Sequence, residues 1–269
     1  ALPVMPASTA LRLTGRDVLP LLHRTTSNAL AELIPGSACV TLFCDFRGRL
    51  QHRALVAVAG DGAVWLLRPD APGDELAAAV DRMVFRDDVK IEDHSGEFVF
   101  LLAAAPAGSA GVLREDGGVP QAIACGDGTQ LVLDGGDALS EPQRIARLLT
   151  RHGHEIAEAF NPFEVGLAHE VHLAKGCFTG QEALQRLITY DSVRRRPAHL
   201  RLDAEEVSVP ADLLADGERI GVLTSNAGRD GFAVVRNEVI ANASELSLAD
   251  GTRVEVVTAP EPSRPVGRP

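Results

Sequence analysis

The sequence predicts an α+β fold built mainly from antiparallel sheets. Short apolar strands follow one another with turn signals such as Arg47-Gly48 between them, which is the pattern of hairpins. Helical patterns come in clusters rather than after every strand, and an all-β, barrel-like domain is expected from about Pro197. Hydrophobic residues make up 45% of the 269 residues, so the chain can bury a core in one large domain or in two to three small ones.

The first hundred residues are expected to combine hairpins with two helices. The stretch from Thr14 to Asp17 predicts the start of a helix that runs to about Ser27. The apolar spacing in DELAAAVDRMVF predicts a second helix at 74–85. DVKIED and GEFVFLLAA predict two strands of one hairpin around His94-Ser95-Gly96.

The rest of the chain is expected to be irregular first and then β-rich. The Gly- and Pro-rich segment 106–120 predicts a loop or a short edge strand, and EPQRIARLLTRHG predicts a helix from Ser140 that ends at Gly153. EALQRLITY predicts the next helix. The predicted domains are an N-terminal α+β domain (1–105), a middle α+β domain (106–196), a C-terminal β domain (197–258) and a disordered tail (259–269).

Composition excludes several classes of partner. The net charge is −11, and such a surface repels duplex nucleic acid and anionic membranes. The longest apolar stretch, at 98–107, is too short to cross a bilayer, and no signal peptide is expected at the N-terminus. Four cysteines without a C-x-x-C pair indicate a reducing compartment, so we expect a cytoplasmic protein. We predict no metal site, because the histidines between 152 and 172 follow no ligand template.

One stretch, KGCFTGQE at 175–182, is not readily explained by packing. Thr179 and Glu182 have the spacing of a capping box, so we expect a helix that starts at Gly180, with Cys177 two residues before its cap. The positive end of a helix and the nearby Lys175 would favour a thiolate. The alternative is that Cys177 is a small buried hydrophobic residue beside a glycine turn.

The residues around this stretch are unusually basic for the chain. From 175 to 201 there are six basic and two acidic residues, which gives 6 − 2 = +4 in a chain of net charge −11. An anion-binding rim would explain Arg194, Arg195 and Arg196, and so would an ordinary solvated face.

The octapeptide resembles the signature of the YgfZ-type folate-binding proteins, which are relatives of the glycine-cleavage T protein (aminomethyltransferase). Five further stretches resemble family motifs in the same order along the chain: LTGRD (13–17), TSN (26–28), DFRGR (45–49), NPFEVGL (161–167) and GVLTS (221–225). The resemblance therefore covers most of the chain.

The resemblance implies three small domains in a ring around a central cavity that holds tetrahydrofolate. It also implies an accessory role in assembling or repairing iron–sulfur clusters in client enzymes, with Cys177 as the reactive residue. The residues expected to hold the folate are Lys175, Glu164, Gly176, Gly180, Gln181, Arg186, Arg194, Arg195 and Arg196.

The sequence departs from the aminomethyltransferase pattern at two carboxylates. The catalytic aspartate of those enzymes would fall near His52–Arg53, where this chain has no acid. Ala146 stands where a glutamate is expected near the pterin. Two alternatives to the accessory protein therefore stay open. One is a folate-dependent aminomethyltransferase, and the other is a non-enzymatic interaction module that has lost folate.

We predict that Cys177 reacts faster than the other three cysteines, Cys39, Cys44 and Cys125, which lie on or beside predicted strands. A nearby helix N-terminus stabilises an exposed thiolate by about 0.3–1 kcal/mol, so the activation should be modest. Limiting alkylation followed by peptide mass analysis measures the order of labelling. Equal rates at all four thiols would mean that the glycines only make a turn.

Overall fold

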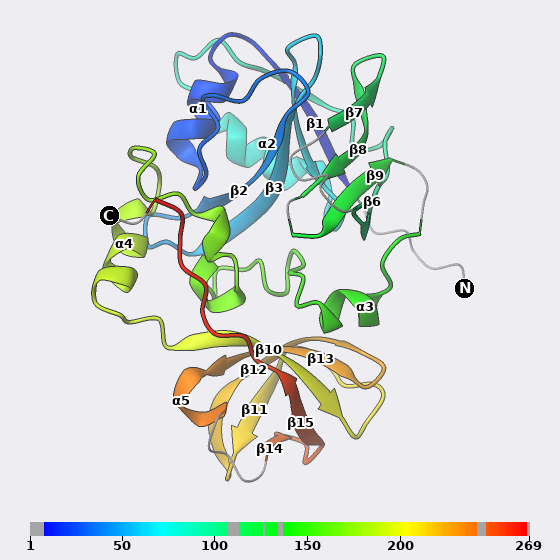
Figure 1. The fold of residues 1–269 in the computed structure, drawn as a ribbon, viewed down its shortest axis with the longest axis vertical. Helices are drawn as coiled ribbons and strands as arrows, with labels where there is room; N and C mark the ends of the chain where they lie inside the picture. Colours follow the sequence, from blue (N-terminus) through cyan, green and yellow to red (C-terminus); the bar gives the residue numbers. More distant parts are fainter. Residues whose placement is uncertain (1–7, 107–112, 126, 134–136, 241–245, 268–269) are drawn as a thin grey trace. The chain divides into compact units, whose positions relative to one another are not determined.

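The structure, a computed structural model, describes residues 8–106, 113–125, 127–133, 137–240 and 246–267 (Figure 1). These residues form two compact units that each combine several stretches of chain. Unit 1 takes its residues from 1–44, 52–139 and 175–179, and unit 2 from 45–51, 140–174 and 180–269. The three-domain division stays a prediction.

Unit 1 is built on a five-stranded sheet with the order β2-β3-β4-β1-β5. Its strands are β1 (Thr9–Thr14), β2 (Ala38–Cys44), β3 (Leu50–Val58), β4 (Val64–Arg68) and β5 (Lys90–Asp93). The predicted hairpin at Arg47-Gly48 is confirmed, because β2 and β3 are neighbours and Gly48 has the positive φ of 73° that the turn requires.

Both faces of this sheet are buried, as the alternation of its residues requires. Leu11 and Leu66 belong to a core formed with helices α1 (Val18–Thr25) and α2 (Gly73–Asp81). Trp65 and Leu67, which point to the other face, belong to a second core together with Phe100. Two apolar faces explain why these strands read as nearly continuous hydrophobic runs.

The second core is shared with a four-stranded antiparallel sheet of order β6-β9-β8-β7. Its strands are β6 (Phe100–Ala104), β7 (Leu113–Asp116), β8 (Val119–Ala124) and β9 (Thr129–Leu133). Phe100, Ile123 and Leu131 are the buried residues that three of these strands contribute to that core.

Unit 2 contains a closed six-stranded barrel of order β10-β13-β12-β11-β14-β15 (Figure 1). Its strands are β10 (Arg195–Leu202), β11 (Ala211–Ala215), β12 (Glu218–Ala227), β13 (Asp230–Arg236), β14 (Leu246–Leu248) and β15 (Arg253–Thr258), with the short helix α5 (Asn237–Ile240) after β13. The predicted α+β class with antiparallel sheets and a C-terminal barrel is confirmed.

The segment between the sheets and the barrel is mostly irregular. It holds α3 (Glu141–Ala146), the 3-10 helices η1 (Pro162–Val165) and η2 (Ala168–Glu170), and then α4 (Gln181–Thr189). The helix predicted to run to Gly153 ends at Ala146, because Leu148 takes a left-handed conformation with φ of 54°. Pro142 lies in the first turn of this helix, and Ser140 and Gln143 form a capping box at its start.

One predicted hairpin is wrong. β5 pairs with β1 in the five-stranded sheet, whereas β6 pairs with β9 in the four-stranded sheet. The turn at His94-Ser95-Gly96 therefore carries the chain from one sheet to the other instead of joining two paired strands. Part of the predicted loop 106–120 (107–112) and the end of the tail (268–269) lie outside the described residues. Within the described part of the chain, no helix is long and apolar enough to span a membrane.

The close packing of β12 predicts a large cost for a methyl group at Gly221. That methyl would lie 2.4 Å from the carbonyl oxygen of Val234, so Gly221→Ala should lower the free energy of unfolding by about 2 kcal/mol. At Gly96 a methyl group would meet nothing within 4 Å, so Gly96→Ala is the matched control and should change stability by less than about 0.5 kcal/mol. Urea unfolding of both variants measures the difference, and equal stabilities would contradict the packing of β12.

Candidate functional site

The KGCFTGQE stretch forms a loop followed by the first residues of α4. Within unit 2, the side-chain amide of Gln181 donates a hydrogen bond to the carbonyl of Leu173 at 2.9 Å, which ties the two ends of the loop together. Cys177 is exposed, and Gly176 before it has φ of 113° with nothing within 4 Å of a Cβ placed there. The exposed thiol contradicts the alternative in which Cys177 is a buried hydrophobic residue.

In unit 1, the side chains of His23 on α1 and of Lys175 each form a hydrogen bond with the backbone carbonyl of the other residue. The ammonium of Lys175 donates to the carbonyl of His23, and Nε2 of His23 lies 3.1 Å from the carbonyl of Lys175. Nδ1 of His23 accepts from the backbone N–H groups of Leu30 and Ala31, at 3.1 Å each. The imidazole proton therefore lies on Nε2, which donates to Lys175.

The side chain of Lys175 is only partly exposed and sits over an aromatic ring. Its Nζ lies 5.0 Å from the ring centroid of Phe178, which is buried. Burial lowers the pKa of Lys175 to about 8, because desolvation penalises the charged ammonium. The ammonium thus has a carbonyl and a ring as its neighbours, and in the described residues it forms no ion pair with a carboxylate.

The predicted capping box at Thr179 and Glu182 is wrong. Helix α4 begins at Gln181 with Gly180 as its N-cap in a left-handed conformation, and no side chain caps it. Glu182 instead pairs with Arg186 one turn later, at 2.5 Å. A Cβ at Gly180 would lie 2.5 Å from the carbonyl oxygen of Asp45, so a glycine is needed for this close approach.

The segment before the loop is paired with the C-terminal part of the chain. The N–H of Leu173 donates to the carbonyl of Val266 at 3.0 Å, and the N–H of Val266 donates to the carbonyl of Val171 at 2.9 Å. At Gly267 a Cβ would lie 2.8 Å from the ring of His172. Residues 259–267, in the tail predicted to be disordered, therefore fasten the segment that leads into the loop.

Glu164 is buried and its carboxylate is already saturated within unit 2. Arg195 donates to it at 2.7 Å, Arg49 lies at 3.5 Å, and the N–H of Asn161 donates at 3.0 Å. Asn161 in turn caps the same short helix, η1. The residue thus holds the DFRGR turn and β10 to the segment around Ala159, and it has little capacity left for a ligand.

The three consecutive arginines have different surroundings. Arg195 is bound by Glu164, and Arg196 is buried with its guanidinium 2.6 Å from Glu261 and 3.2 Å from the carbonyl of Asn237. Arg194 is exposed, and among the described residues its side chain makes no ion pair. Of the three, Arg194 is therefore the cation that can meet an anion without giving up a partner.

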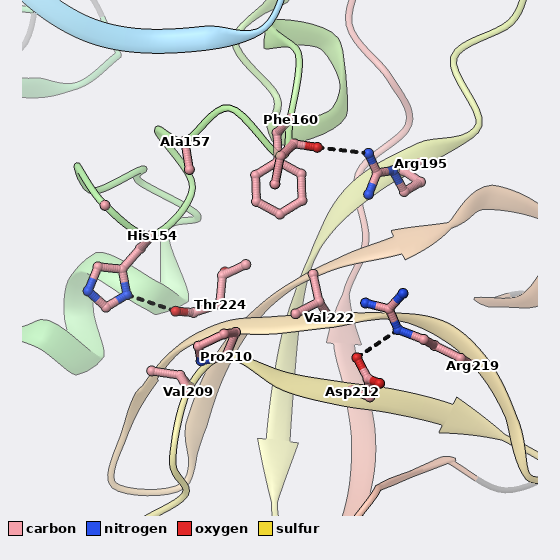
Figure 2. A pocket seen from close by; sticks show the side chains of 12 residues that line it. His154, Ala157, Phe160, Arg195, Val209, Pro210, Asp212, Arg219, Val222 and Thr224 are labelled. Atoms are coloured by element: carbon pink, nitrogen blue, oxygen red, sulfur yellow. Dashed lines mark hydrogen bonds and ion pairs between the residues drawn. The ribbon is translucent and has the colours of Figure 1, made fainter.

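A pocket of about 530 Å³ opens in unit 2 between residues 153–160 and the barrel strands β11 and β12 (Figure 2). Its walls combine apolar side chains, one aromatic ring and two guanidinium groups: Ala157, Phe160, Val222, Pro210, Arg195 and Arg219. Arg195 lies 5.3 Å from the centroid of the Phe160 ring, and Arg219 pairs with Asp212 at 2.6 Å. Pockets of this size take ligands the size of a typical cofactor or drug.

A buried carboxylate holds one wall of this pocket in place. Glu155 is fully buried and accepts hydrogen bonds from the hydroxyl groups of Thr224 and Ser225 on β12. The N–H of Arg151 also donates to it at 3.0 Å, and the guanidinium of Arg144 lies at 3.4 Å. The Thr-Ser pair of the GVLTS stretch is thus used to anchor Glu155, and beside it Nδ1 of His154 donates to the carbonyl of Thr224 at 2.7 Å.

Sequence reasoning missed several residues of these sites. Nothing in the sequence singled out His23, Phe160 or Arg219, because their roles depend on contacts between stretches far apart in the chain. Cys177 and Arg195 were selected by local spacing and charge in the sequence. These features do not show which residues they contact in space.

Comparison with known proteins agrees with the motifs. The profile of the family described as "CAF17, C-terminal beta-barrel domain" matches residues 194–261, which is the barrel of unit 2. A putative chloroplastic transferase of Arabidopsis thaliana is 24% identical over 81% of this chain, and the matched region spans 60% of that relative. The aminomethyltransferase of Moorella thermoacetica is 31% identical over 60% of the chain and 40% of its own length.

Two further comparisons extend over nearly the whole chain. The aminomethyltransferase of Geobacillus kaustophilus is 24% identical over 92% of this chain and 82% of its own. The crystal structure of the glycine cleavage system aminomethyltransferase T from Bartonella henselae has the same fold, with a TM-score of 0.74 and 15% identity over 94% of this chain and 84% of that one. The chain is thus similar to aminomethyltransferases over most of its length, and its barrel matches the CAF17 C-terminal barrel family, in agreement with the resemblance drawn from the motifs.

The contacts of the arginines predict that two neighbouring substitutions differ in their effect on stability. Arg195→Ala removes the 2.7 Å partner of the buried Glu164 and should lower the free energy of unfolding by about 1–3 kcal/mol. Arg194→Ala removes an exposed cation and should change it by less than about 0.5 kcal/mol. Urea unfolding of the two variants compares them directly, and an Arg195→Ala variant as stable as the Arg194→Ala one would contradict the role of Glu164.

Proposed function

We propose that this protein is a tetrahydrofolate-binding accessory protein for the assembly or repair of iron–sulfur clusters, with Cys177 as its reactive group. The observation that carries the proposal is the combination of an exposed cysteine in the KGCFTGQE loop with a CAF17-type barrel in one chain. Client enzymes that hold the clusters would be its partners. The reducing environment that free cysteines require is consistent with the cytoplasm.

The pocket of unit 2 fits a folate by the chemistry of its walls (Figure 2). A folate combines a flat heteroaromatic ring, an aromatic linker and a carboxylate tail, and the pocket offers the ring of Phe160, apolar walls and the guanidinium groups of Arg195 and Arg219. When bound, tetrahydrofolate supplies nitrogen atoms that carry one-carbon units. Arg194, which is exposed at the start of the barrel, would attract a longer glutamate tail.

Aminomethyl transfer is disfavoured by the residues in place of the expected acid. His52 is buried, with Nδ1 3.2 Å from the guanidinium of Arg68, and Arg53 forms an ion pair with Asp127 at 3.3 Å. Neither side chain is a carboxylate that could take a proton from the folate nitrogen. The other alternative is an interaction module without folate. Ala146 favours it, because this exposed residue supplies no carboxylate where one is expected near the pterin.

Calorimetric titration with tetrahydrofolate carrying one or several glutamates tests the proposal. We expect binding of both, and Arg194→Ala should weaken the polyglutamate about two- to fivefold more than the monoglutamate, because an exposed ion pair contributes up to about 1 kcal/mol. Arg229→Ala is the matched control, since Arg229 is also exposed and makes no side-chain ion pair in the described structure.

Three outcomes separate the readings. No binding of either folate would leave the interaction module, and methylene transfer from an aminomethyl donor would establish the transferase. If the protein binds folate, Cys177→Ser should still bind it but should fail to restore iron–sulfur enzyme activity in cells that lack the protein. Full restoration by Cys177→Ser would contradict the role of the thiol.

A further inference from the structure

The basic residues of this chain are almost all arginines. Of 26 lysines and arginines, 24 are arginines, and the two lysines are Lys90 and Lys175. A guanidinium stays charged in proteins and is a poor nucleophile, whereas a lysine amine loses its proton when it is buried and can then attack an electrophile. The two lysines therefore carry the side-chain amine chemistry of the chain.

The two lysines lie in opposite environments. Lys90 is 71% exposed and pairs with Glu92 at 2.6 Å, which stabilises its charged form. Lys175 is half-buried, its Nζ donates to the carbonyl of His23, and the ring of Phe178 lies 5.0 Å away. Among the described residues no carboxylate pairs with Lys175, so no anion compensates for the loss of solvent around its charge.

We infer that Lys175 is an amine nucleophile that captures small aldehydes as imines at the KGCFTGQE loop. The lone pair of the neutral amine attacks the carbonyl carbon and forms the carbon–nitrogen bond. Two protons leave nitrogen and the carbonyl oxygen departs with them as water, so R–NH₂ and H₂C=O give R–N=CH₂ and H₂O. No oxidant or reductant takes part, and water reverses the step.

Burial makes the required neutral amine available near physiological pH. With a pKa of about 8, about a quarter of Lys175 is neutral at pH 7.5, against about 0.1% of an ordinary lysine. The fraction of neutral, reactive amine grows as the pH rises toward the pKa and levels off above it. A neutral amine still has two N–H bonds, so it can donate to the carbonyl of His23 and keep its lone pair free.

Hydrogen bonds fix the position of Lys175, and the loop beside it is open. The backbone of Lys175 is held by Nε2 of His23. Gly176, the next residue, is exposed, and nothing lies within 4 Å of where its side chain would start. The ring of Phe178 lies 5.0 Å from Nζ.

The inference deepens the proposed function and rests on it only for the source of the carbon. Tetrahydrofolate that carries a one-carbon unit at the oxidation level of formaldehyde would be the donor. The reactivity of Lys175 toward a free aldehyde requires no folate, so the two ideas can fail separately.

The test is reductive trapping on the full chain without folate. Dilute formaldehyde and cyanoborohydride are added at pH 7.5, and early methylation at Lys175 and Lys90 is measured by peptide mass in the same sample. We expect Lys175 to be methylated about tenfold faster or more, as the difference in neutral amine predicts. Its rate should rise from pH 6.5 to about 9 and then level off, because the amine is then almost fully neutral.

A control variant separates the two lysines. Lys90→Arg should leave trapping at Lys175 unchanged. Equal rates at Lys175 and Lys90 in the native chain, or a Lys175 rate that rises in parallel with that of Lys90 above about pH 9, would overturn the inference. If trapping is selective while the folate titration fails, the amine chemistry stands and the proposed function falls.

Discussion

The position of the KGCFTGQE loop depends on two hydrogen bonds between His23 and Lys175. Each residue gives a side-chain donor to the backbone carbonyl of the other, so neither can move without breaking two contacts. This pair of hydrogen bonds also needs a fixed tautomer, which the N–H groups of Leu30 and Ala31 impose on the imidazole. A helix end and the turn after it thus hold a loop that lies about 150 residues further along the chain.

Much of the fold could be predicted because its strands follow local rules. The strands of the five-stranded sheet alternate between two buried faces, and the Arg47-Gly48 turn joins two of them. The error at His94 had a physical cause, because a turn signal states that the chain reverses but not which strand each arm will join. Helix α3 was predicted too long because EPQRIARLLTRHG has helical spacing throughout. The helix ends at Ala146 because Leu148 takes a left-handed conformation.

The sequence selected candidate site residues by charge and spacing, but it did not show which partners they have in the structure. Charge and spacing selected Arg194, Arg195 and Arg196 together, but Glu164 and Glu261 lie 31 and 65 residues from their arginine partners. Glu164 itself was expected to face the ligand and is enclosed by arginines. Cys177 was selected from the residues next to it in sequence, whereas His23 was missed because it meets Lys175 only in space.

The pairing of Val266 with Val171 and Leu173 has a consequence for the order of events during synthesis. The N–H of Leu173 lacks its final partner until the ribosome has made the whole barrel and the segment after it. A chain that folds as it emerges can therefore build the two sheets of unit 1 early, whereas the residues that lead into the cysteine loop reach their final pairing among the last. A nascent chain would thus carry Cys177 after a segment that has not yet reached its final pairing.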